Sequence, residues 1–199
     1  KTTLHTPEAS LTPSPAPIWT TTPTTSPVPV GFEAQAQESA PPSRIVIPVL
    51  GVDGPVVPVS LEKMEVQGQI QSVWGVPDER AAGWHESSAS LGETGNMVLN
   101  GHNTNNGEIF RDLYTLDAGE EIIVYSGEIS RTYAVSQILI LPEGGQRLEV
   151  RLANARYVLP TDDERLTLVT CHPYGSLRNR LIVIARPPEF NTSSEPPED

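Results

Sequence analysis

The chain has a single cysteine, Cys171, in surroundings that suit nucleophilic chemistry. It lies in the segment LTLVTCH (166–172), and Arg180 follows in the next apolar segment. A thiolate is a strong nucleophile that cationic neighbours favour, and an arginine also presents several donors to a developing oxyanion. Acyl transfer by such a pair further needs a group that carries protons to and from a leaving amine.

Four histidines are candidates for this proton transfer. His5 is discounted because it lies in a stretch rich in proline and threonine. His172 directly follows the cysteine, so a regular strand would turn it to the opposite face. His85 lies in a predicted loop. His102 ends the apolar segment NMVLNGH (96–102), which predicts a strand that presents it at a sheet rim, so it is the first candidate, with His85 and His172 as alternatives.

Strand alternation relates the cysteine to the arginine. The segments 165–171 and 180–186 predict two strands on either side of the loop HPYGSLRN. If they pair as a hairpin, Cys171 and Arg180 can lie side by side at one rim. The same alternation places on this face three residues that are expected to line a groove, with an ordinary core role as the alternative: Thr167, Val169 and Ile182.

The elements around these segments predict a β-rich domain. Residues 44–62 predict two strands around a turn at Val52–Pro55, and residues 76–96 predict a long loop. Residues 108–116 have near-helical spacing of apolar side chains and predict one or two helical turns.

A further hairpin is predicted over 120–126 and 130–141, with its turn at Ser126-Gly127. The chain shows no alternation of helices and strands of the parallel α/β kind. The pattern therefore predicts a mainly β fold, an antiparallel β-barrel with one or two short helices.

Composition divides the chain into three parts. Residues 1–43 hold nine of its twenty prolines and predict an extended linker rich in Pro, Thr and Ser. Residues 44–188 predict the folded domain, and residues 189–199 predict an acidic, solvated tail that contains proline. The net charge of −12, without a basic cluster, argues against a nucleic-acid partner.

A single cysteine leaves no internal disulfide and no multi-cysteine metal site, and we expect no cofactor. No apolar run reaches the roughly 18 residues that a membrane helix needs. Contact with a membrane is therefore expected only through an anchor outside this chain.

Three motifs together resemble the sortase family. TLVTC (167–171) matches its Thr-Leu-x-Thr-Cys signature, NGH (100–102) resembles the segment of its catalytic histidine, and RLIVIA (180–185) resembles the strand that opens with its catalytic arginine. The motifs occur in the family's order, and the similarity extends over about residues 44–187. Pro-Thr linkers and the Cys-His-Pro continuation most resemble classes D, E or F.

The resemblance implies a closed eight-stranded barrel and a transpeptidase on the extracellular side of a membrane. Such an enzyme cleaves a sorting signal like Leu-Pro-x-Thr-Gly on surface proteins between Thr and Gly, and passes the thioacyl product to a peptidoglycan or pilin amine. By motif, Cys171 is the nucleophile, His102 the acid and base, and Arg180 the oxyanion or substrate contact. Asn103 follows His102 where many relatives carry Arg, Ser or Thr, so the group that orients the imidazole is left open.

Two alternatives remain at this stage. One is a secreted β-barrel interaction or structural module, in which Cys171 is buried filler and a thiol-reactive probe would fail to label it. The other is a hydrolase that uses the same residues, which an assay with an amine acceptor would distinguish.

Overall fold

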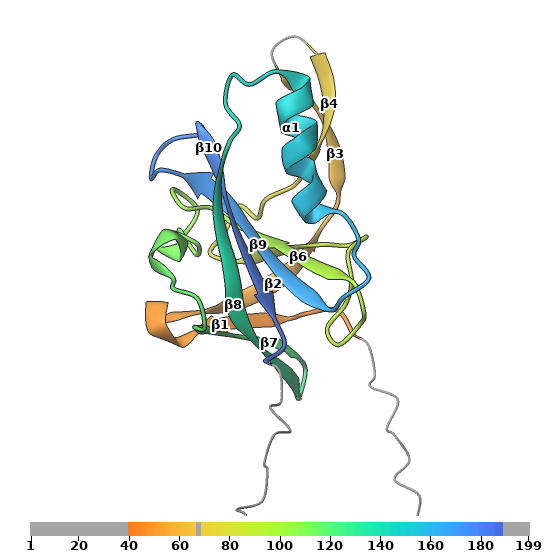
Figure 1. The fold of residues 1–199 in the computed structure, drawn as a ribbon, viewed down its shortest axis with the longest axis vertical. Helices are drawn as coiled ribbons and strands as arrows, with labels where there is room; N and C mark the ends of the chain where they lie inside the picture. Colours follow the sequence, from red (N-terminus) through yellow and green to blue (C-terminus); the bar gives the residue numbers. More distant parts are fainter. Residues whose placement is uncertain (1–39, 67–68, 189–199) are drawn as a thin grey trace, which may run out of the picture. The chain divides into compact units, whose positions relative to one another are not determined.

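The computed structural model describes residues 40–66 and 69–188, and its main feature is a closed barrel of eight strands (Figure 1). The order around the barrel is β1-β2-β5-β6-β9-β10-β8-β7. Its strands are β1 (Arg44–Ile47), β2 (Val52–Val59), β5 (Ala82–His85), β6 (Asn96–Asn100), β7 (Glu121–Ser126), β8 (Ile129–Pro142), β9 (Arg165–His172) and β10 (Asn179–Arg186). The described part of the chain has a single α-helix, α1 (Leu148–Ala155), so the expected mainly β barrel with few helices is confirmed.

The predicted linker and tail lie outside the described residues, apart from residues 40–43. These four residues are tied to the barrel. Ala40 forms a β-bridge with Leu91, and the Ser43 amide donates to the Tyr125 carbonyl at 2.7 Å. The folded domain therefore includes residues 40–43, which lie before the predicted boundary at Arg44.

Alternation of side chains along β9 and β10 separates the barrel core from its outer face. Leu166, Leu168, Leu181 and Val183 belong to the central hydrophobic core. Thr167 on β9 and Ile182 on β10 alternate with these core residues and face outward, because successive strand residues point to opposite sides. The outer face of these two strands carries the candidate site.

The barrel is not wholly antiparallel. β2 pairs with β5, and β6 pairs with β9, in parallel register. Parallel neighbours need a long crossover connection. The chain from residue 60 to residue 81 supplies one such connection between β2 and β5, and residues 101–164 supply the other.

The first turn of the barrel differs from the prediction. The turn is not at Val52–Pro55, which lies within β2, but in the 3-10 helix η1 (Pro48–Leu50). Pro48 fits the first position of a helical turn because its fixed φ suits it and no amide donor is lost there. Gly51 ends the turn with φ of +62°, a left-handed conformation that favours glycine.

The chain between β2 and β6 is more regular than its sequence predicted. Strands β3 (Leu61–Val66) and β4 (Gln69–Trp74) form a hairpin outside the barrel that was not predicted. The predicted loop 76–96 contains β5, whose four residues are all buried. β5 is too short for its sequence to reveal a period, so its pairing with β2 and β6 identifies it as a strand.

The predicted helix over 108–116 is only the 3-10 turn η2 (Leu113–Thr115). Glu108, where the helix was predicted to begin, has a φ of +51°, a left-handed conformation that does not occur in a right-handed helix. The α-helix α1 lies instead between β8 and β9, followed by the 3-10 turn η3 (Arg156–Val158).

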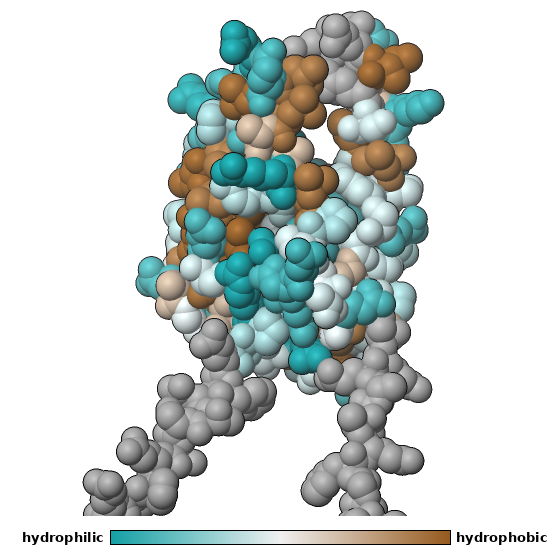
Figure 2. All heavy atoms as spheres, turned by 45° about the vertical axis from the view of Figure 1, so that its right-hand side comes forward, coloured by the Kyte–Doolittle hydropathy of each residue, from teal (hydrophilic) through white to brown (hydrophobic). Residues whose placement is uncertain are grey.

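Exposed apolar side chains gather at the end of the molecule where α1 and the β3–β4 hairpin project (Figures 1 and 2). On the helix they are Leu148 and Leu152, which lie one turn apart. On the hairpin they are Leu61, Met64 and Ile70. Figure 2 shows open space between these two projections.

Candidate active site

Cys171 and Arg180 lie opposite one another on the antiparallel strands β9 and β10. Arg180 Nη1 donates a hydrogen bond to Cys171 Sγ at 2.7 Å. Both residues are half-buried, so the pair is packed against the protein and still reaches solvent. A guanidinium at this place can hold negative charge on the sulfur or on an oxygen bound beside it.

His102 follows the end of β6, on the other side of β9 from Arg180. β6 and β9 run parallel with Asn100 opposite Val169, so two further residues along each strand bring His102 level with Cys171. Neighbouring strands lie about 4.8 Å apart, which places the two main chains one strand spacing from each other. His102 therefore lies just beyond the end of β6, beside the end of β9 that carries Cys171, and Arg180 pairs with Cys171 from the opposite side of β9.

The predicted groove residues lie on the same outer face, but they are buried to different degrees. Val169 is half-buried, whereas Thr167 is 0% exposed and Ile182 is 3% exposed. The Thr167 hydroxyl donates to Asn96 Oδ1 at 2.7 Å, so its polar atom is already bonded within the protein. Thr167 and Ile182 are covered, and Val169, which is opposite Ile182, lies between Thr167 and Cys171 along β9.

His85 lies at the end of β5 and is stacked on Trp74, with ring centroids 4.0 Å apart and planes 13° from parallel. The imidazole is 3% exposed, and burial lowers the pKa of His85 to about 4. It is therefore neutral at pH 7, and its Nε2 has no hydrogen-bond partner in the described part of the protein.

His172 directly follows the cysteine, and its ring lies 5.8 Å from that of Tyr114 in a tilted contact. It packs against the loop that contains η2. His5 lies outside the described residues. Of the three histidines in the described part of the chain, His85 and His172 thus pack against other side chains, and His102 is the one beside Cys171 and Arg180.

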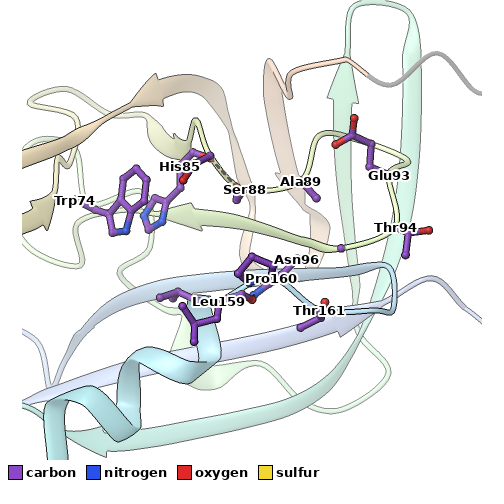
Figure 3. A pocket seen from close by; sticks show the side chains of 13 residues that line it. Trp74, His85, Ser88, Ala89, Glu93, Thr94, Asn96, Leu159, Pro160 and Thr161 are labelled. Atoms are coloured by element: carbon purple, nitrogen blue, oxygen red, sulfur yellow. Dashed lines mark hydrogen bonds between the residues drawn. The ribbon is translucent and has the colours of Figure 1, made fainter. Parts of the chain in front are cut away.

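A pocket of about 390 Å³ lies between the loop after β5 and the loop before β9 (Figure 3). The stacked rings of Trp74 and His85 form one wall, and Leu159 and Pro160 form part of another. Asn96 Nδ2 holds the second wall in place by donating to the Tyr157 and Leu159 carbonyls at 3.0 and 2.9 Å. The pocket is preformed, mainly apolar, and located at the end of β6 and β9 away from Cys171.

The loops on the other side of the cysteine are joined by three side chains that sequence reasoning missed. Tyr174 Oη donates to Glu108 Oε1 at 2.6 Å, and Arg111 lies over the Tyr174 ring and bonds Glu108. The hydrogen bond from Tyr174 is the main reason that the pKa of Glu108 is lowered. The pattern of the sequence gives no signal for this contact, because it joins loops 66 residues apart.

Asn103 is a further residue that the sequence did not place in the site. Its side chain is buried, and its Nδ2 donates to the main-chain carbonyl of Cys171 at 2.7 Å. The only signal in the sequence is its position directly after His102.

Within residues 40–66 and 69–188, no group of three His, Cys, Asp or Glu side chains is arranged to hold a metal ion. In the same part of the chain no helix is both long and apolar enough to cross a membrane.

A model of the sortase domain matches residues 45–188. The chain belongs to the sortase family. This family consists of cysteine transpeptidases that act at the cell surface, in agreement with the single cysteine placed at the rim of the barrel.

Solved structures show that this sortase also has the fold of its family. Sortase A of Corynebacterium diphtheriae, as a lid mutant, is 20% identical with a TM-score of 0.56, covering 81% of this chain and 77% of that one. A sortase D5 transpeptidase of Clostridium perfringens is 25% identical with a TM-score of 0.52, and the match covers 74% of this chain and 78% of that one. Sortase C-1 of Actinomyces oris is 21% identical with a TM-score of 0.53, and the match covers 73% of this chain and 72% of that one.

These similar structures belong to classes A, C and D, with TM-scores that lie close together. The class of this sortase accordingly stays a prediction. A comparison with curated protein sequences found no match.

Proposed function

We propose that this sortase cleaves a sorting signal of the Leu-Pro-x-Thr-Gly type between Thr and Gly and transfers the new carboxyl end to an amine. The observation that carries the proposal is the 2.7 Å contact between Arg180 Nη1 and Sγ of Cys171, the only cysteine in the chain. The proposed donors are surface proteins that carry the signal. The proposed acceptor is an amine of peptidoglycan or a pilin, at the extracellular face of a membrane to which a segment outside this chain anchors the enzyme.

In the first half of the reaction, the Cys171 thiolate attacks the carbonyl carbon of the signal's Thr. The oxygen gains negative charge, and Arg180 stabilises it from the position in which it now contacts the sulfur. The bond from this carbon to the Gly nitrogen then breaks. His102 gives a proton to the departing amine, which leaves a thioester on Cys171.

In the second half, the acceptor amine attacks the thioester carbon. His102 takes the proton that this amine loses, the carbon–sulfur bond breaks, and the Cys171 thiolate is restored. If water attacks instead, the same residues perform hydrolysis.

The outer face of β9 offers a track for the signal. Its Leu lies three residues before the Thr, so an extended peptide places it about 10 Å from Cys171. Thr167, four strand residues from Cys171, lies about 13 Å away along β9. Across β6, Val98 is opposite Thr167. On the other side of β6, Trp84 of β5 pairs with Leu99, so the next residue of β5, His85, lies beside Val98. We therefore assign the apolar pocket at Trp74 and His85 to the signal's Leu, and contact with the central residues of the signal to Val169.

Mass spectrometry of the protein mixed with sorting-signal peptides tests this proposal. We expect an adduct on Cys171 equal to the peptide up to its Thr, and we expect the Cys171→Ala variant to form neither adduct nor cleavage product. Addition of an amine acceptor should convert the adduct into a transfer product. Cleavage by Cys171→Ala at the parent rate would overturn the assignment. Failure of a thiol-reactive probe to label Cys171 in the folded protein would favour a non-catalytic module.

A further inference from the structure

Asn103 connects the segment of His102 directly to the peptide of Cys171. Its side chain is 4% exposed, and Nδ2 donates to the Cys171 carbonyl at 2.7 Å and to the Pro173 carbonyl at 3.4 Å. Its Oδ1 accepts a hydrogen bond from the Thr104 hydroxyl at 3.3 Å. A buried amide whose two ends are both bonded has one preferred orientation, so this contact fixes the loop against β9.

The Asn103 side chain occupies a place that the main chain would fill in a longer strand. The parallel ladder between β6 and β9 continues to Gly101, whose amide donates to the Val169 carbonyl at 3.1 Å. In a regular parallel ladder the next main-chain donor after Gly101 is the amide of Asn103. Its acceptor is the next carbonyl after that of Val169 on β9 with the same orientation, which is the carbonyl of Cys171. The side-chain amide of Asn103 donates to this carbonyl.

The main chain around His102 is held on its other sides as well. The Thr170 hydroxyl donates to the Gly101 carbonyl at 2.8 Å, and the Phe110 amide donates to the His102 carbonyl at 3.0 Å. Thr170 and Phe110 are themselves buried. Of these contacts, the one from Asn103 is the bond that reaches the nucleophile's own residue.

The loop beyond Asn103 turns away from the sheet at once. Asn105, Asn106, Gly107 and Glu108 all have φ between +46° and +81°. Such left-handed conformations in succession are unfavourable for residues other than glycine, and they persist where the surroundings hold them in place. The hydrogen bonds of Asn103 anchor the chain between His102 and this loop, so the turn of the loop away from the sheet does not displace the imidazole.

We propose that Asn103 is a positioning residue for proton transfer: its amide holds the His102 segment against the Cys171 peptide and so sets the separation between imidazole and sulfur. This inference rests on the proposed roles of Cys171 and His102. It assigns to Asn103 no contact with the substrate.

The test compares Asn103→Ala with Asn103→Gln, which keeps an amide donor, and with Asn103→Ser, whose hydroxyl keeps hydrogen-bonding capacity in the buried site but is too short to reach the carbonyl. Two rates are measured for each: cleavage of a sorting-signal peptide, and alkylation of Cys171 by iodoacetamide as a function of pH. The second rate needs no substrate, and its pH midpoint reports the coupling of the thiol to its neighbours.

A matched control is Asn96→Ala. Asn96 is 2% exposed, and its Nδ2 also donates to two main-chain carbonyls, but it lies at the opposite end of β6. Its loss should lower the melting temperature much as the loss of Asn103 does. The alkylation midpoint of this control should match that of the parent, because the bonds it loses are remote from the sulfur.

We expect Asn103→Ala and Asn103→Ser to lower kcat by about 10²-fold, the effect typical of a misplaced catalytic group, and to move the alkylation midpoint. KM should stay within about twofold, because a group that acts only on the reacting state changes kcat. Asn103→Gln should recover part of kcat. If Asn103→Ala does not fold, the Ser and Gln variants supply the same comparison.

The inference is overturned if Asn103→Ala and Asn103→Ser keep the parent's alkylation midpoint, or if they keep the parent's kcat. It is also overturned if their loss lies wholly in KM. Failure of the proposed function would look different, because Cys171→Ala would then cleave the peptide or the parent would form no adduct with it. The alkylation curves would still report on Asn103 in that case.

Discussion

Arg180 and Cys171 are direct partners across the β9–β10 hairpin, and Arg180 Nη1 lies 2.7 Å from Cys171 Sγ. The pairing register fixes the two Cα atoms, so the contact needs only the side chain of Arg180 to turn toward the sulfur. Both side chains face the outer surface of the barrel, where they are half-buried.

Arg180→Lys should lower turnover by about 10²- to 10³-fold, the effect of removing one oxyanion donor in other acyl-transfer enzymes. Lysine keeps the charge but loses the planar fork of donors that can contact sulfur and oxygen together. Steady-state kinetics on a sorting-signal peptide measure the effect. Arg178→Lys is the control, because Arg178 is exposed in the preceding loop and should change turnover little. Equal, small effects at both positions would remove Arg180 from the active site.

His102→Ala should lower turnover by at least about 10²- to 10⁴-fold, the usual contribution of general acid–base transfer. His172→Ala should retain most of the parent rate, because its ring packs against Tyr114. Peptide cleavage followed over a range of pH measures both variants. Comparable losses in the two would show that β9 is broken at Cys171 in solution.

His85 should make folding stability depend on pH between about 4 and 6.5. Its pKa is about 4 in the folded protein and about 6.5 in an unfolded chain. In this window the unfolded chain binds the extra proton, so the free energy of unfolding falls as pH falls, by at most about 3 kcal/mol. Above pH 6.5 both states are neutral and the contribution is constant.

Chemical denaturation at pH 7 and pH 4.5, on the parent and on His85→Phe, measures this dependence. Phenylalanine can keep the stack on Trp74 and cannot titrate. The parent should lose more stability than the variant between the two pH values. The carboxylates titrate in both proteins, so their contribution cancels in the difference. Parallel losses would mean that His85 is hydrated in solution.

Deletion of residues 1–39 should leave peptide cleavage in solution nearly unchanged. Among the described residues, the first hydrogen bond that ties this end of the chain to the barrel is that of Ala40, whose carbonyl accepts from the Leu91 amide at 3.1 Å. Deletion of residues 1–43 is the comparison, and it should lower the melting temperature by removing the bonds of Ala40, Pro41 and Ser43. A large loss of cleavage on the shorter deletion would assign a role in the site to residues 1–39.

Gly101→Ala should destabilise the protein by about 1–3 kcal/mol, the usual effect of overpacking. A Cβ at this position would meet Phe110 Cδ2 at 2.6 Å and Ile109 Cγ2 at 2.9 Å, and both of these residues are buried. Gly75→Ala is the control, because its Cβ would meet only the end of the Glu62 side chain at 3.3 Å and the Ser60 carbonyl at 3.6 Å. Thermal unfolding distinguishes the two. Equal melting temperatures would mean that the segment beside His102 can shift freely.

The hairpin of β9 and β10, and the face that Cys171 shares with Arg180, could both be predicted from the sequence. Both follow from alternation within two strands that a short loop joins, so the register depends on neighbouring residues only. The family motifs and the mainly β character are likewise local properties. The apolar segment 96–102 was also visible as a strand that leads to His102.

Features that depend on pairing between distant segments are apparent only in the folded protein. β5 is a strand because it pairs with β2 on one side and with β6 on the other. The sequence predicted the face on which Thr167 and Ile182 lie, but it did not predict that both residues are buried there. Asn103 reaches the Cys171 carbonyl only because β6 and β9 lie parallel and adjacent, 68 residues apart in the chain. Local periodicity determines which face a side chain occupies, whereas burial and the partner of a polar atom depend on every segment that packs around it.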